Sequence, residues 1–327
     1  MTIENLINII SGELVNEPKI KRVESATIYP SKVDSGDLFF ATDKESADKA
    51  IENGAFAIVY EDELEITDSE IAYIKVESIK EATLKFLRYV VLQKESKIYL
   101  FEDIDISFLK QIVSRRSSIY TIISSDWKKS FEAVLNSDYE VYITNSKELA
   151  ESLSPNYRTQ KELAYGYIIS DSLLKTTFKI DKYIYQNAQM SPLFIDNIKK
   201  VVNFCQDWDI EYDINRLKYT KEFRPFYVED DLTPSNIGTT EKVLIFVNNL
   251  KIVDRAIQYL RHDGKWIKSI VLTPPKSKLE TVDRPNWYQN EQEAKEILKN
   301  NFFHYAFCYN LKPEDILNKE EDNSSLF

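Results

Sequence analysis

The chain has few of the residues that phosphate loops, metal sites and disulfide frameworks require. It contains six glycines, two cysteines and two histidines among 327 residues. No two glycines are close enough to form a glycine-rich phosphate loop. Cys205 and Cys308 are far apart, which excludes a disulfide framework and suits a reduced cytoplasm. Because His262 and His304 show no ligand spacing with these cysteines, the sequence predicts no zinc site and no Ser-His-Asp or Cys-His catalytic group.

An excess of basic residues and long apolar runs are also missing. The formal net charge is −11, which argues against nucleic acid as a partner, although a local basic pocket for an anionic ligand stays possible. The N-terminal apolar stretch is too short and too acidic for a signal peptide, and no segment reaches the length of a membrane span. We therefore expect a cytoplasmic protein with no membrane span.

The remaining composition, 43% hydrophobic and 29% charged, is that of a globular protein with room for two or three domains. Strand-like and helix-like segments alternate along much of the chain, which predicts an α/β fold with Rossmann-like layers and a parallel sheet. We expect domains at 1–95, 96–235 and 236–327. Expected helices include 4–10, 48–53, 79–92, 106–114, 127–135, 146–153, 193–205, 251–261 and 291–300. Expected strands include 38–41, 71–76, 97–101, 118–123, 139–144, 165–170, 176–180, 183–186, 242–248, 266–272 and 304–309, and 214–228 resembles a strand rich in aromatics.

Residues 31–59 are the most informative part of the chain. Asp34-Ser35-Gly36-Asp37 predicts a turn in which Gly36 adopts a positive φ. A short apolar strand, a helix, Gly54 as the residue after the helix, and a second apolar strand follow. A generic β-α-β unit with a glycine cap is the alternative interpretation.

This stretch resembles the N-terminal domain of the Mur ligases, which add amino acids to UDP-N-acetylmuramyl peptides using ATP. The resemblance rests on Ser31-Lys32-Val33, on Ser35-Gly36-Asp37-Leu38-Phe39-Phe40-Ala41, and on Ala50-Ile51-Glu52-Asn53-Gly54-Ala55-Phe56-Ala57-Ile58-Val59. It departs from the family where Lys32 replaces an arginine, where the spacer before Val33 is lost, and where the Asp-Gly-His segment is shortened. The resemblance covers about residues 1–95, and it implies that Ser31 contacts the uridine end of a UDP-linked muramyl precursor and that Lys32 contacts an anion.

The ATP equipment of that family is not recognisable in the sequence. Laid over the family's Gly-Thr/Ser-Asn-Gly-Lys-Thr-Thr loop, Ser124 to Ser130 matches at Lys128 and Ser130, while Ser124 and Trp127 replace both glycines. A bulky Trp127 blocks the close approach of backbone to phosphate. The alternative is an unrelated helix start capped by Ser124, Ser125 or Asp126. Lys128 and Ser130 are thus candidates for a degenerate nucleotide site, and we expect neither a metal site nor a cofactor.

Two further segments are open to a functional or a structural interpretation. Val247-Asn248-Asn249 resembles the strand end that faces the nucleotide in the family, but it lacks the acidic residue and equally fits a helix cap. Residues 282–288 combine Arg284 with aromatics and either contact a carboxylate or sugar or pin a loop.

Three hypotheses follow from the sequence. The first is a degenerate Mur-ligase-like protein of bacterial peptidoglycan precursor metabolism, which binds a UDP-muramyl peptide or regulates its synthesis without ATP-dependent catalysis. The second is an active amide ligase with an unorthodox nucleotide site. The third is a module that binds a cell-wall synthesis protein through an exposed aromatic patch from Phe223 to Tyr227.

Overall fold

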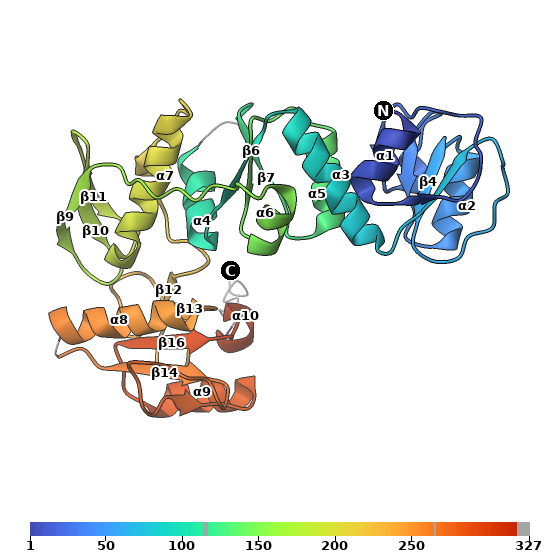
Figure 1. Ribbon diagram of the computed structural model, residues 1–327. Coiled ribbons are helices and arrows are strands. Elements are labelled where there is room, and N and C mark those ends of the chain that lie inside the picture. Colours follow the sequence, from blue (N-terminus) through green and yellow to red (C-terminus); the bar gives the residue numbers. More distant parts are fainter. Residues whose placement is uncertain (114–116, 265, 319–327) are drawn as a thin grey trace, which may run out of the picture. The chain divides into compact units, whose positions relative to one another are not determined.

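The computed structural model describes residues 1–113, 117–264 and 266–318, which form two compact units. Unit 1 comprises Met1–Glu102 and Arg115–Gln160, and unit 2 comprises Asp103–Ser114 and Lys161–Phe327. Both have mixed α/β architecture, with helices packed on parallel sheets, which confirms the predicted fold class (Figure 1). The predicted division into three domains stays a prediction.

The first sheet of unit 1 has the strand order β1-β5-β4-β3-β2, in which β1 is antiparallel and the other four strands are parallel. Alternate side chains enter two cores, so that Leu38 and Phe40 face one cluster and Phe39 faces the other. The strands are β1 (Glu13–Leu14), β2 (Ala26–Thr27), β3 (Leu38–Phe40), β4 (Ala57–Tyr60) and β5 (Ala72–Lys75), and the helices are α1 (Ile3–Ile10), α2 (Lys44–Glu52) and α3 (Ile79–Gln93).

The structure confirms the turn, strand, helix and glycine sequence predicted for residues 31–59. Gly36 and Gly54 have φ values of 104° and 95°, a conformation that L side chains rarely adopt. Helix α2 begins at Lys44, four residues earlier than the predicted Asp48, because Asp43 and Ser46 form a capping box. Residues Pro30–Lys32 form a short 3-10 turn, η1, which begins three residues after the end of β2.

A second sheet of unit 1 is parallel, with the order β6-β8-β7. Helix α3 lies between the two sheets of the unit, and Phe86 of α3 packs 5.4 Å from Phe40 of β3 and 6.2 Å from Phe131 of α5. The two sheets therefore share one core. The elements are β6 (Lys97–Leu100), β7 (Tyr120–Ile122), α5 (Trp127–Leu135), β8 (Val141–Thr144) and α6 (Lys147–Leu153).

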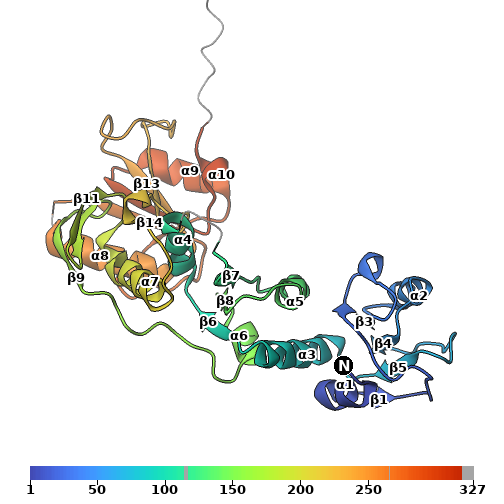
Figure 2. The same ribbon diagram turned by 90° about the horizontal axis from the view of Figure 1, so that it is seen from above.

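The first part of unit 2 is a three-stranded antiparallel sheet beside two packed helices. Figure 2 shows α4 and α7 side by side, and their contacts make them one helical pair. The elements are α4 (Asp103–Ile112), β9 (Gly166–Asp171), β10 (Thr176–Ile180), β11 (Tyr183–Ala188), η2 (Pro192–Phe194), α7 (Ile195–Asp207) and η3 (Ile214–Arg216). The predicted end of α4 at Ser114 lies outside the described residues.

The C-terminal sheet of unit 2 has the order β12-β13-β16-β14-β15, parallel except for β12. Helices α8 and α9 cover its opposite faces (Figure 1). The elements are β12 (Arg224–Tyr227), β13 (Val243–Val247), α8 (Leu250–Asp263), β14 (Ser269–Thr273), β15 (Asn286–Trp287), α9 (Glu291–Asn300), β16 (Tyr305–Tyr309) and α10 (Pro313–Ile316).

The strand-like prediction for residues 214–228 is largely wrong. Only β12 forms there, preceded by the 3-10 turn η3, because the apolar side chains of this segment are buried without strand pairing. The prediction of an exposed patch from Phe223 to Tyr227 is wrong as well. Phe223 is 2% exposed and packs 5.5 Å from Phe194. Within the described part of the chain, no helix is long and apolar enough to cross a bilayer.

Candidate functional site

The carboxyl edge of the first sheet carries Ser31 and Lys32. Both lie in η1, which follows β2 after two residues, and the turn is held by Asn53, whose amide donates to the Pro30 carbonyl at 2.9 Å. Ser31 is exposed, and among the described residues its hydroxyl has no hydrogen-bond partner. Ligands of open α/β sheets bind at such strand ends. The predicted residue Ser31 is therefore accessible at the edge where a ligand is expected.

Lys32 is paired with a carboxylate that the sequence analysis missed. Its ammonium lies 2.7 Å from Glu132 Oε2 on α5 and 4.9 Å from the centre of the Tyr29 ring. The hydrogen bond to Glu132 raises the pKa of Lys32, so this lysine stays charged. The Glu132 side chain is 15% exposed and also accepts hydrogen bonds from Thr27 at 3.3 Å and from Asn136 at 3.1 Å. An anion at Lys32 must share this cation with Glu132.

The segment from Ser124 to Ser130 is the start of helix α5. Asp126 is the N-cap and its carboxylate accepts from the Lys128 backbone N–H at 3.0 Å. The hydroxyl of Ser130 is fully buried and donates to the Ser124 carbonyl at 2.6 Å. Such a cap satisfies one of the N–H donors that a phosphate would otherwise use, and it adds a negative charge. The helix-cap interpretation of this segment fits these bonds.

Helix α5 brings the predicted residues of both segments to the same part of unit 1. Lys128 is exposed, lies over the Trp127 ring at 5.6 Å, and contributes to lowering the pKa of Asp43, which the Ser46 backbone N–H lowers most. Asp43 follows β3 and therefore lies at the same edge as Ser31. Lys128 and Glu132 are four residues apart, which places them on one face of α5. The spacing from Lys128 places Glu132 on that face, but nothing in the sequence pairs it with Lys32, which lies a hundred residues away.

The connections from parallel strands to helices in the second sheet are short. They consist of Phe101–Glu102 after β6, Ile123–Asp126 after β7 and Asn145–Ser146 after β8, and none contains a glycine. A phosphate loop of the Gly-x-x-x-x-Gly-Lys-Ser/Thr type needs about eight residues and two glycines. None of these connections supplies the two glycines of such a loop.

A separate cavity of unit 2 lies where β13 and β16 end. It has a volume of 490 Å³ and is lined partly by Asn248, Asn249, Lys251 and Lys278. The Asn249 side chain accepts from the Lys251 backbone N–H at 3.0 Å, so it acts as the helix cap of α8. The structural interpretation of Val247-Asn248-Asn249 therefore accounts for Asn249. The two lysines share this cavity with three carboxylates, Asp103, Asp254 and Glu280.

The described residues contain no group of three or more His, Cys, Asp or Glu side chains that could hold a metal ion. Both cysteines are fully buried, and burial raises the pKa of the Cys205 thiol to about 12. Such thiols are neutral at neutral pH and are poor nucleophiles.

Comparison with known proteins identifies the fold and gives no sequence match. No family model matches the sequence, and no curated protein matches it. The UDP-N-acetylmuramoylalanyl-D-glutamyl-2,6-diaminopimelate–D-alanyl-D-alanyl ligase from Acinetobacter baumannii is similar in structure, with a TM-score of 0.53 and 11% identity, over 96% of each chain. A structure of MurF from Acinetobacter baumannii has a TM-score of 0.55 and 11% identity, over 94% of this chain and 95% of that one. The chain thus has a Mur-ligase-like fold along nearly its whole length.

Proposed function

We propose that this protein binds a UDP-linked muramyl-peptide precursor through its N-terminal α/β domain and does not couple that binding to ATP-dependent ligation. The fold similarity to two solved Mur ligase structures supports the choice of precursor class. The resemblance of residues 31–59 to the UDP-binding domain of these ligases supports the choice of domain. Fold alone does not define a function, so the proposal depends on the two sites.

The Ser31 turn supports recognition of the uridine diphosphate. An exposed hydroxyl beside a cation gives one hydrogen bond for a neutral base or ribose and one charge for a diphosphate. Because Glu132 competes for Lys32, the diphosphate alone binds weakly and the muramyl peptide must add contacts. We therefore expect the intact precursor to bind more tightly than UDP.

The hydrogen bonds at the start of α5 are the main support for a role without ATP-dependent ligation. Asp126 occupies the helix N-terminus, and the Ser130 hydroxyl is engaged with the Ser124 carbonyl. A P-loop serine instead holds Mg²⁺, and its backbone N–H groups point at phosphate. These bonds favour binding or regulation over catalysis for this chain.

Calorimetric titration of the full chain with a UDP-N-acetylmuramyl peptide tests the proposal. We expect binding, and we expect Ser31→Ala to weaken it about three- to tenfold, because one hydrogen bond contributes about 0.5 to 1.5 kcal/mol. Ser69→Ala is the matched control, since Ser69 is an exposed serine that precedes β5 at the opposite edge of the same sheet. An absence of binding, or an affinity that Ser31→Ala leaves unchanged, contradicts the proposal.

A further inference from the structure

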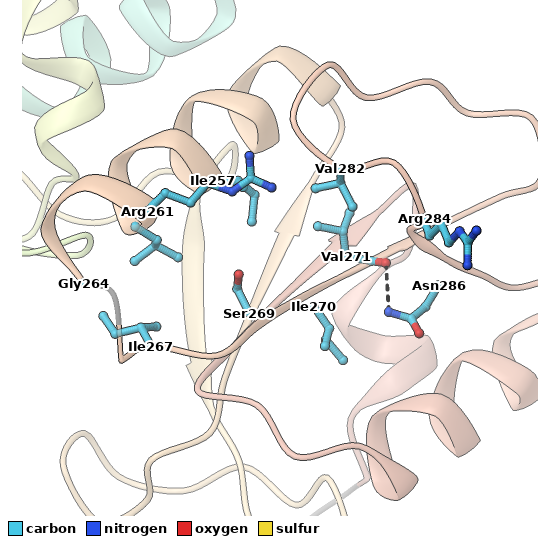
Figure 3. Close-up of a pocket in the computed structure, with 11 residues that line it drawn as sticks. Ile257, Arg261, Gly264, Ile267, Ser269, Ile270, Val271, Val282, Arg284 and Asn286 are labelled. Atoms are coloured by element: carbon cyan, nitrogen blue, oxygen red, sulfur yellow. Dashed lines mark hydrogen bonds between the residues drawn. The ribbon is translucent and has the colours of Figure 1, made fainter.

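A cavity on the α8 side of the C-terminal sheet lies away from the strand ends discussed above. It has a volume of 400 Å³ and is bordered by the second half of α8, the first residues of β14 and the segment that leads into β15 (Figure 3). Small-molecule sites have volumes of about 300 to 1,000 Å³. The cavity is therefore large enough for a small organic molecule.

The cavity exists because the sheet is incomplete at this edge. Strand β15 has only two residues, and they pair with Leu272 and Thr273 at the end of β14. Ser269 and Ile270, at the beginning of β14, have no strand partner on that side and are only half-buried. Val271 to Thr273 are buried. The open edge thus follows from the length of β15.

The cavity is lined on one side by apolar side chains, and its charged lining residues are both arginines. Ile257 and Leu260 of α8 are each 4% exposed, and Ile267 and Val282 extend the apolar surface. Arg261 and Arg284 are the charged residues that line the cavity among those described, and no aspartate or glutamate lines it. A local positive charge inside a chain of net charge −11 favours an anionic ligand.

Two polar groups point into the same space. Figure 3 shows Arg261 beside Ile257, with the Ser269 hydroxyl pointing toward the space between Arg261 and Val282, whereas the Arg284 guanidinium points away from Arg261. Arg261 donates to the Thr281 carbonyl at 2.5 Å, which fixes the guanidinium and leaves other N–H groups for a ligand. Ser269 makes no side-chain hydrogen bond with any described residue. Arg261 and Ser269 form the polar end of the cavity.

We propose that this cavity binds a small carboxylate with an apolar body, whose carboxylate contacts Arg261 and Ser269 and whose body packs on Ile257, Leu260 and Val282. A guanidinium binds a carboxylate through charge-assisted hydrogen bonds with fixed geometry. The apolar wall favours an aromatic or branched hydrocarbon body over a second polar group. This site is independent of the Ser31 turn, and neither proposal depends on the other.

Titration of the full chain with hydrocinnamate, followed by calorimetry and ligand-observed NMR, tests the site. We expect a Kd on the order of 0.1 mM for a ligand of this size. Hydrocinnamide, the neutral isostere, should bind at least tenfold more weakly. Arg261→Met keeps the apolar stem, removes the charge, and should weaken hydrocinnamate about tenfold. Arg255→Met is the matched control on the same helix, because Arg255 does not line the cavity, and it should change the affinity less than twofold.

A second variant fills the space instead of removing the charge. Ser269→Leu places a larger side chain in the cavity and should abolish hydrocinnamate binding while thermal unfolding shows a folded protein. The proposal is wrong if hydrocinnamate does not bind, if hydrocinnamide binds equally well, or if Arg261→Met has no effect. It is also wrong if inorganic phosphate binds as tightly and competes, since the cavity would then be a general anion site.

Discussion

At the scale of single residues, Cys205 links burial to pH. It lies on α7 without exposed surface, and burial raises the pKa of its thiol from 9.0 to about 12. The unfolded chain releases this proton near pH 9, while the folded chain retains it. Above that pH the unfolded state binds fewer protons, so the free energy of unfolding falls as the pH rises.

We predict that Cys205→Ala removes part of this alkaline loss of stability. Between the pKa of the thiol in the unfolded chain and its pKa in the folded chain, the free energy of unfolding falls by about 1.4 kcal/mol per pH unit. Urea unfolding at about pH 8 and about pH 11 should therefore show the variant losing about 2 to 3 kcal/mol less than the unmodified chain. Val201→Ala, a buried change on the same helix, should leave the pH dependence unaltered. If Cys205→Ala and the unmodified chain lose the same free energy of unfolding between the two pH values, the prediction is contradicted.

Single residues also define how far the sequence predicts the candidate site. Ser31 was found because its neighbours resemble a known turn. Glu132 was missed because it lies about a hundred residues further along the chain, and only folding brings it to Lys32. In the sequence, Ser130 resembles the hydroxyl residue of a phosphate loop. Its burial and its hydrogen bond to the Ser124 carbonyl become visible only in the folded structure.

At the scale of elements, α4 and α7 are joined by a buried polar group. Asp105 is 0% exposed, and its carboxylate accepts from Asn197 at 2.8 Å and from Lys200 at 2.7 Å. Lys200 is 20% exposed, so most of the pair lies away from water. Removing one member of such a pair leaves the other charge buried without compensation.

We predict that Asp105→Ala lowers the free energy of unfolding by about 3 kcal/mol. Asp196→Ala is the control on α7, because Asp196 is 71% exposed and pairs with Lys199 at 3.6 Å. Because the Asp196 carboxylate is largely in water, although the Lys199 side chain is only 16% exposed, we expect this pair to contribute less than about 1 kcal/mol. Denaturant unfolding of both variants measures the difference, and equal losses would show that Asp105 does not link the helices.

The elements that the sequence predicted well have strong local signals. Helices α5 and α9 coincide with the predicted 127–135 and 291–300, since each follows an N-cap residue, Asp126 and Asn290. Strands β2 and β15 have two residues each and are too short for a periodic pattern. Residues 214–228 misled the prediction because aromatic and apolar side chains there are buried by tertiary packing without forming a ladder.

At the scale of the whole molecule, a ligase-like fold is combined with strand–helix connections that contain no glycine. The fold similarity extends over both units, so it is not confined to the segment that resembles a UDP-binding domain. An active amide ligase would still need a phosphate cradle. The connections after β6, β7 and β8 do not supply the usual glycine-rich phosphate cradle. This favours the proposed binding role over the alternative of an active ligase with an unorthodox nucleotide site.

We predict that the full chain binds neither ATP nor Mg·ATP at about 1 mM, the upper end of usual KM values. Trp127→Gly should not create binding, because the Asp126 cap and the Ser130 hydroxyl bond remain. Thermal shift and ADP release, measured with and without a UDP-muramyl peptide and an amino acid, provide the readouts. ADP release that requires both the UDP-muramyl peptide and the amino acid would show that the chain is an active ligase, and it would overturn this part of the proposal. The effect of Ser31→Ala on precursor binding would remain a separate result. A binding protein should instead show a higher unfolding temperature with the UDP-muramyl peptide alone, in the absence of any added nucleotide.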